Sequence, residues 1–390
     1  MNAWRTVRTV LAKELVDALR DRRTLLTVLA SAVLMGPLVL LAISGLVASL
    51  ESSADQREVV AAGVERAPTL KNFLERQTYR VRPAPADYEQ QLRASSLTDA
   101  VVVIPPAFET ELQRGETPLL EIVSDSANQR SVASASRLAQ LLAGFNRERA
   151  LLSLALRGVS PDLLEPVEVQ SRDLASTQTR ATRITGMLPF FVMMAVLTGA
   201  LTAALDTTAG ERERGSLEPL LMNPSERWAL VLGKWGAVAS VAMLVAVLSC
   251  LSFLPGQWWL RSDTLAAMFQ YGPAEAAQFL VVLLPFAAAV SALLMAVAIR
   301  CKTLKEAQAS TTVVMLCASL LPLVNLFSLG EEAPWNLWVP ALAQNVLMTH
   351  VLKGDALIAT QLAVPTLLCV AITVAALAAV ARVLRVAAVR

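Results

Sequence analysis

The sequence predicts an all-α polytopic membrane protein with six transmembrane helices and an extracytoplasmic α/β domain inserted between the first two. With 55% hydrophobic residues the chain is too apolar for an ordinary soluble protein, and with 17% charged residues it cannot lie in a membrane throughout. Its apolar residues gather in uncharged runs that each exceed the roughly 20 residues a helix needs to cross about 30 Å of hydrocarbon. These runs are 24–50, 184–205, 235–260, 276–299, 307–330 and 356–381.

The lysines and arginines orient these spans. With the N-terminus inside, the short inner segments hold 16 lysines and arginines and the short outer ones hold two, as the positive-inside rule requires. A seventh uncharged run, 333–352, is interrupted by prolines and polar residues, and as a span it would place the arginines of the predicted cytoplasmic tail, 382–390, outside. We therefore expect an outer re-entrant or interfacial helix at 333–352, with Trp335 and Trp338 at headgroup level.

Residues 1–23 predict an amphipathic helix on the inner membrane surface, because apolar and charged side chains recur on opposite sides at helical spacing. The alternative is a solvated basic leader that only sets topology. A signal peptide is disfavoured, because both the charged leader and the following uncharged run are too long for one. The apolar side holds Trp4, Val7, Leu11, Leu15, Ala18 and Leu19, and the charged side holds Arg5, Arg8, Lys13, Asp17 and Arg20.

Residues 51–183 are the one large polar segment, and the topology places them outside the cell. Their acidic and basic residues nearly cancel, which is compatible with export because long domains translocate largely regardless of charge. Short β-branched runs alternate with helical patterns and precede one long helix, so we expect a small α/β domain. The expected strands are 59–64, 79–81, 100–104 and 119–123, and the expected helices are 69–77, 87–95, 106–114 and 130–157.

Catalytic and metal-binding residues are scarce, so we predict neither a catalytic residue nor a metal site, and we do not expect an enzyme. His350 is the one histidine and has no carboxylate or cysteine at ligand spacing, so an interfacial role is the simpler interpretation. The four cysteines lie in or next to spans and form no paired metal-ligand pattern. The net charge of +2 gives no indication of a nucleic-acid partner, since topology explains the basic residues.

The spans carry almost no ionisable groups, which argues against an autonomous ion-coupled carrier. Lys234 lies at an inner boundary, where its amine can snorkel to the interface. The remaining polar groups at bilayer depth are hydroxyls and amides, and each is expected to bond back to its own helix rather than to form a dehydrated ion site. They include Thr198, Thr202, Ser291, Thr311, Thr312 and Asn325.

The charged segment 206–234 is the best functional candidate. Its GERERGS stretch has the glycine spacing of a nucleotide-binding P-loop, but it lacks the lysine and carries glutamates that would repel phosphate. If ATP drives this protein, another chain therefore binds it. Leu217, Leu220 and Leu221 form one apolar strip of a short helix, with acidic residues in its early turns. The alternative is a charged hairpin that only sets topology and has no partner.

Three features in matching order resemble the ABC-2-type transporter permeases. They are the Lys-Glu-Leu and Arg-Asp-Arg-Arg leader at 13–23, an external α/β domain after one span, and GERERGSLEPLL from Gly210. A weaker match at 340–345 resembles the Pro…Asn-Gln segment of the sodium-extrusion and drug-efflux subgroup, with the amides swapped. The resemblance covers nearly the whole chain, and GERERGSLE is its specific part.

The resemblance implies a type V exporter-like fold in the bacterial cytoplasmic (inner) membrane. Two permease subunits, identical or close paralogues, would form the pathway in contact with membrane lipid, and two separate ABC ATPase subunits would bind ATP and magnesium, so that this chain needs no cofactor. The cargo would be a small molecule, a drug or an ion such as sodium. The implied ATPase-coupling residues are Glu211, Arg212, Glu213, Gly215, Leu217 and Glu218, and the implied connecting-helix contacts are Lys13, Glu14, Arg20, Arg22 and Arg23.

A reading from another class stays open. A membrane-anchored sensor or scaffold would bind a ligand with its external domain and a regulator with the inner loop. It would need no ATPase, so the presence or absence of an ATPase partner separates the two hypotheses.

Overall fold

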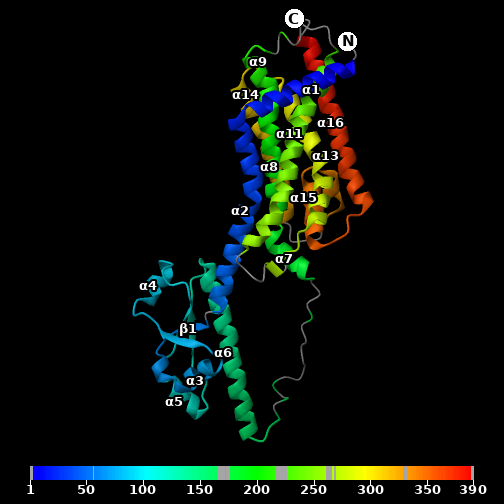
Figure 1. The fold of residues 1–390 in the computed structure, drawn as a ribbon. Coiled ribbons are helices and arrows are strands. Elements are labelled where there is room, and N and C mark those ends of the chain that lie inside the picture. Colours follow the sequence, from blue (N-terminus) through cyan, green and yellow to red (C-terminus); the bar gives the residue numbers. More distant parts are fainter. Residues whose placement is uncertain are drawn as a thin grey trace. The chain divides into compact units, whose positions relative to one another are not determined.

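The chain divides into a helical unit, residues 1–49 with 174–390, and an α/β unit, residues 50–173. The computed structural model describes residues 3–55, 57–160, 162, 164, 172, 176–216, 219, 226–260, 266–267, 269–327 and 333–387. Figure 1 shows the elements of both units.

Six helices in the described residues are long and apolar enough to cross a membrane, matching the number of predicted spans. The helix α13 lies at the centre of the helical unit and packs against α8, α11, α14 and α16. Its core is built from large side chains that are almost fully buried, including Phe253, Phe279, Leu283 and Phe286. The six helices are α2 (Arg22–Asp55), α8 (Leu188–Leu205), α11 (Arg227–Gly256), α13 (Pro273–Ala298), α14 (Leu304–Phe327) and α16 (Ala359–Ala387).

Both ends of the charged segment predicted at 206–234 are helical in the structure. The helix of α8 does not stop at Leu205 but continues through a π-helical turn, η3 (Asp206–Gly210), into α9 (Glu211–Glu213). At the other side, α11 already begins at Arg227 rather than at 235. Polar residues can extend a membrane helix beyond the hydrocarbon when neighbouring groups satisfy them, and a run of uncharged residues cannot reveal such an extension.

The second predicted span also starts later than expected. Residues 177–185 form a separate helix, α7 (Thr177–Thr185), which begins after Ser176, whose hydroxyl accepts a hydrogen bond from the Thr179 amide. The membrane-length helix α8 begins only at Leu188, three residues beyond the end of α7. An N-cap serine followed by threonines favours a helix start there, although the sequence reads as a polar linker.

The outer segment predicted at 333–352 consists of two elements, η5 (Pro334–Trp338) and α15 (Leu342–Lys353). The side chains of α15 are mostly buried, and the helix packs against α13, α7 and α14. With 12 residues it is about 18 Å long, too short to cross a bilayer. Burial within the unit favours the re-entrant alternative, while Trp335 and Trp338 remain exposed.

The α/β unit is built on a mixed four-stranded sheet with the order β2-β1-β3-β4. The strand β1 is parallel to both β2 and β3, and β4 runs antiparallel to β3. Alternate residues of β1 point to opposite faces, so that Val59 packs in one apolar cluster with α3, α5 and α6, and Val60 packs in another with α4. The strands are β1 (Glu58–Ala62), β2 (Arg80–Pro83), β3 (Val101–Val103) and β4 (Glu121–Val123), and the helices are α3 (Pro68–Arg76), α4 (Tyr88–Arg93), α5 (Phe108–Arg114) and α6 (Gln129–Leu156).

Candidate functional site

The N-terminal helix α1 (Ala3–Arg20) lies across the end of the helical unit where α9 also lies, and we call this the α1 end (Figure 1). It packs closely on α11 because Gly233 has no side chain: a Cβ there would lie 2.7 Å from Cβ of Val10. Trp4 adds an edge-to-face ring contact with Trp228, at 6.1 Å between centroids. The amphipathic helix expected at the N-terminus is therefore a packed part of the helical unit.

The buried side of α1 differs from the predicted apolar side. It carries Thr6, Val10 and Glu14, whereas Trp4 and Leu19 are 66% and 59% exposed. The apolar pattern assigned Glu14 to neither side, because it could not show that a buried cation lies opposite this carboxylate.

That cation is Lys234 of α11, whose side chain is only 3% exposed. Its amine donates to Oε1 of Glu14 at 2.8 Å, to Oε2 of Glu211 at 2.5 Å and to the carbonyl oxygen of Thr207 at 3.0 Å. An ammonium has three protons to donate, so each has a partner. The expectation that Lys234 snorkels to the interface is wrong, because this amine is held inside the protein.

A second amine completes the arrangement. Lys13 contacts the other carboxylate oxygen of Glu211 at 2.7 Å and Oε1 of Glu14 at 3.1 Å. Partial burial opposes the charge on Lys13, but its hydrogen bond to Glu211 and the charges of Glu14 and Glu211 outweigh that cost and raise its pKa. We call Lys13, Glu14, Glu211 and Lys234 the lysine–glutamate cluster; two positive and two negative charges balance within it.

The cluster joins three elements that are far apart in sequence, namely α1, α9 and α11. Ion pairs of this kind contribute little net stability when formed, because both partners lose water, but removing one partner costs roughly 3–5 kcal/mol because a buried charge is left alone. The cluster therefore fixes how α1, α9 and α11 lie relative to one another more than it adds to stability.

The two residues after Glu211 bind the ends of two further helices. Arg212 donates to the carbonyl oxygen of Cys301 at 2.9 Å, just beyond the C-terminus of α13. Glu213 accepts the backbone amide of Leu304, the first residue of α14, at 2.8 Å. A cation at a helix C-terminus and an anion at an N-terminus both complement the helix dipole. The turn between α13 and α14 is thereby held against α9.

Gly215 ends this charged helix. With φ of +70° it adopts the left-handed conformation, its amide donates to the Arg212 carbonyl at 3.1 Å, and the Ser216 amide donates to the Glu211 carbonyl at 3.0 Å. This is the Schellman pattern, in which glycine at the position after the C-cap carries no steric cost. In the GERERG stretch, charged side chains therefore bind α1, α11 and the adjoining ends of α13 and α14, and Gly215 then ends the helix.

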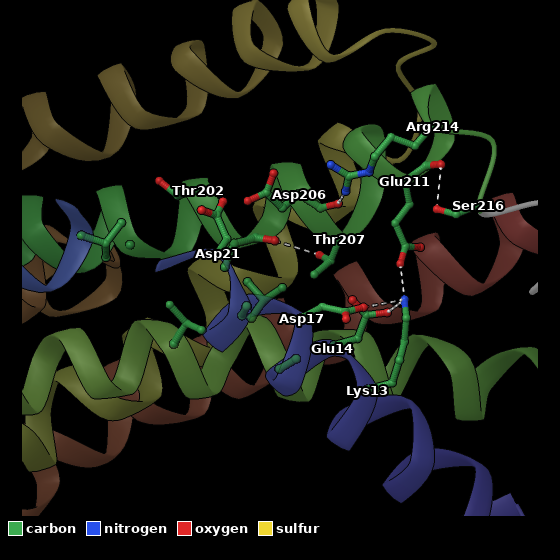
Figure 2. A pocket seen from close by; sticks show the side chains of 17 residues that line it. Lys13, Glu14, Asp17, Asp21, Thr202, Asp206, Thr207, Glu211, Arg214 and Ser216 are labelled. Atoms are coloured by element: carbon green, nitrogen blue, oxygen red, sulfur yellow. Dashed lines mark hydrogen bonds and ion pairs between the residues drawn. The ribbon is translucent and has the colours of Figure 1, made fainter. Parts of the chain in front are cut away.

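A cavity of about 440 Å³ lies beside the cluster, between α1, α2, α8 and α11 (Figure 2). Its walls are apolar where α2, α8 and α11 contribute, as at Val28 and Val241. At the α1 end they are charged, with five acidic and two basic side chains: Glu14, Asp17, Asp21, Asp206, Glu211, Lys13 and Arg214. This size and this mixture of apolar surface with a few polar groups are usual for small-molecule sites.

The structure brings together some of the predicted site residues and not others. Lys13, Glu14, Glu211, Arg212 and Glu213 meet at the α1 end. Leu217, Glu218, Leu220 and Leu221 lie outside the described residues, and so does the predicted coupling helix that they form. Arg20 is exposed at the end of α1, while Arg22 and Arg23 start α2 with side chains outside the described part.

The hydroxyl groups at membrane depth behave as expected. Thr198 and Thr202 each donate to the carbonyl four residues earlier, at 2.8 and 3.0 Å, and Ser291, Thr311 and Thr312 do the same in α13 and α14. Within the described ranges, no three histidine, cysteine or acidic side chains are grouped to hold a metal ion.

Six apolar helices with a charged, clamped end define a multi-pass membrane protein. A family model described as ABC-2 family transporter protein matches residues 28–383, so the chain belongs to the ABC-2 transporter family. Over 331 residues, or 83% of this chain and 82% of the relative, it is 26% identical to a protein of Bacillus subtilis (strain 168) named "ABC transporter permease protein NatB". The chain is thus a transmembrane transporter subunit of a family whose permeases typically work with an ATPase subunit.

Proposed function

We propose that this chain is the permease subunit of an ATP-driven ABC-2-type exporter, and that the α1 end is its coupling end. Two copies, or one copy and a close paralogue, form the pathway, and two separate ATPase subunits bind ATP and magnesium beneath them. No residue of this chain takes part in the chemistry of hydrolysis; its task is to transmit motion.

The observation that carries the proposal is the set of contacts made by Glu211, Arg212 and Glu213. Through these three side chains, α9 is bound to α1, to α11 and to the turn between α13 and α14. A push on the segment that follows α9 would therefore reach four helices at once. A hairpin that only set topology would need charged residues there. It would not need a cation at the C-terminal end of α13 and an anion at the N-terminal end of α14.

The orientation follows from the charge distribution. We place both termini and residues 206–234 in the cytoplasm of a bacterial cell, across its inner membrane, and residues 51–183 outside. The large excess of lysine and arginine in the short segments at the α1 end supports this.

The cargo is a small molecule, a drug or an ion such as sodium. Acidic side chains outnumber basic ones in the cavity lining, five to two, and this excess favours a positively charged cargo over an anion. The apolar walls favour a cargo with an apolar body.

The test is recovery of the chain from its native cells in mild detergent, with mass spectrometry of the proteins that accompany it. The expected result is a stoichiometric P-loop ATPase, lost when Glu218 is replaced by lysine but retained after Lys71→Met in the α/β unit. If no ATPase accompanies a folded chain, the sensor or scaffold reading takes its place.

The Glu218→Lys variant is preferable to Glu211→Gln in this experiment. Glu211 is 5% exposed and holds two lysines, so its loss disturbs the permease itself. Export that persists with ATPase recovery unchanged in Glu218→Lys would contradict the coupling role of this segment.

A further inference from the structure

The α/β unit contains a cavity of its own, of about 470 Å³, between α5, the segment that leads to β4, and α6. Its floor is apolar and is formed by Phe108, Leu142 and Phe145, which are all at least nine-tenths buried in the core of the unit. Rigid, apolar floors of this size are usual in sites for small organic ligands. Transport as proposed above makes no use of this cavity.

One charged side chain of the wall has a buried atom without a partner. Arg149 of α6 lines the cavity and is half-buried, and its buried Nε has no hydrogen-bond partner among the residues that the structure describes. Arg149 as a whole is only partly buried, but a buried polar atom without a hydrogen-bond partner, such as its Nε, calls for an explanation.

The neighbouring acidic groups do not supply that partner. Glu148, the adjacent residue in α6, pairs with Arg76 at 2.6 Å. Glu116 is the one acidic residue among those that line the cavity, and it is exposed and forms no ion pair with Arg149. The other polar groups of the wall, such as Asn146 and Ser153, are neutral. The cavity thus presents a positive charge above an apolar floor.

We infer that this cavity is a binding site for a small organic carboxylate with an apolar body. The guanidinium of Arg149 offers a planar set of donors that matches the two oxygens of a carboxylate, and such a bond is charge-assisted. Phe108, Leu142 and Phe145 take the apolar part. The exposed carboxylate of Glu116 in the wall disfavours ligands with several negative charges. The α/β unit is then a ligand-binding module carried by the transporter subunit.

The test uses the full-length chain in lipid nanodiscs with 4-fluorophenylacetate as the probe, observed by fluorine NMR. Saturable binding is expected for this carboxylate. The neutral 2-(4-fluorophenyl)ethanol and the cationic 4-fluorophenethylamine should not bind, because they lack the anion. Phenyl phosphate, added as a competitor, separates a carboxylate site from a general oxyanion site.

Two variants locate the site independently. Arg149→Gln should weaken binding by about tenfold or more, as loss of a charge-assisted hydrogen bond predicts. Ala143→Trp should abolish binding by filling the cavity without touching the charge. Arg147→Gln removes the same charge two residues away on the same helix and should leave binding unchanged.

The inference is overturned if wild-type protein shows no saturable binding of the carboxylate, or if Ala143→Trp binds as the wild type does. An equal loss of carboxylate binding in Arg149→Gln and Arg147→Gln would also overturn it, since the positive charge of the helix surface would then explain the binding. Binding of phenyl phosphate without the carboxylate would replace the ligand class. If Arg149→Gln does not fold, Ala143→Trp decides.

Discussion

At the scale of residues, the main finding is that buried ion pairs hold the helices of the α1 end in place. Lys234 has three acceptors for its three protons, namely a carboxylate oxygen of Glu14, one of Glu211 and the Thr207 carbonyl oxygen. The π-helical turn matters here, because its Thr207 carbonyl is one of those acceptors. Such turns inside α-helices are often found at functional sites.

Replacing Lys234 by methionine tests this arrangement. The variant keeps the length and apolar stem of the side chain but leaves Glu14 and Glu211 with only Lys13. We expect the free energy of unfolding to fall by roughly 3–5 kcal/mol, measured by denaturant unfolding in detergent. The matched control, Lys305→Met in α14, alters an exposed amine near the same end and should change stability by less than about 0.5 kcal/mol. Equal effects in the two variants would contradict the role of the cluster.

A double-mutant cycle measures the interaction between Glu211 and Lys234 separately from the contribution of each residue to stability. The double variant Lys234→Met with Glu211→Gln should lose less stability than the sum of the two single variants, because Glu211→Gln removes a carboxylate that Lys234→Met has already deprived of one of its two lysines. The expected interaction free energy is about 1–3 kcal/mol. Strict additivity would mean that Glu211 and Lys234 do not depend on each other.

At the scale of elements, α1 is held by shape as well as by charge. Gly233 and Gly236 both face α1, but they differ in what a methyl group would meet. At Gly233 a Cβ meets Cβ and Cγ1 of Val10 at 2.7 and 2.8 Å, whereas at Gly236 it meets only the flexible end of Leu11 at 3.2 Å.

Gly233→Ala should therefore displace α1, and Gly236→Ala should be tolerated. Gly45→Ala in α2 is the control, since a Cβ there meets nothing within 4 Å. Hydrogen exchange of the amides of residues 3–20 is the readout, and we expect at least a several-fold increase in Gly233→Ala alone. Unchanged exchange in that variant would show that α1 does not depend on this close approach.

How far the sequence predicts these elements depends on whether the signal is local. Spans follow from uncharged runs, and the strands of the α/β unit follow from β-branched runs, so β1 and α6 lie within about two residues of the expected ranges. The contact of Glu14 with Lys234 joins residues 220 positions apart, and no periodicity carries such information. The sequence singles out the charged residues of GERERG, but Arg212 and Glu213 bind backbone groups of Cys301 and Leu304, which have no sequence signature.

At the scale of the whole molecule, the proposed topology makes a separate prediction. A protease added outside sealed cells should cut within residues 51–183 and leave 206–234 intact, because the excess of positive charge keeps the latter inside. Digestion of inside-out vesicles should give the opposite pattern. Cleavage of 206–234 from outside would overturn the orientation and, with it, the coupling role of the α1 end.

The lysine–glutamate cluster also bears on how the protein is made. Glu14 leaves the ribosome early, Glu211 follows after the second span, and Lys234 arrives only with the third. Until then the nascent chain carries two carboxylates with Lys13 as their one amine from the cluster. We therefore expect α1 to pack stably only after the third span has been synthesised. In a chain that ends before residue 227, α1 lacks its ion-pair partner Lys234 and stays exposed. That helix is a feature by which the quality-control machinery of the cell could tell unfinished chains from finished ones.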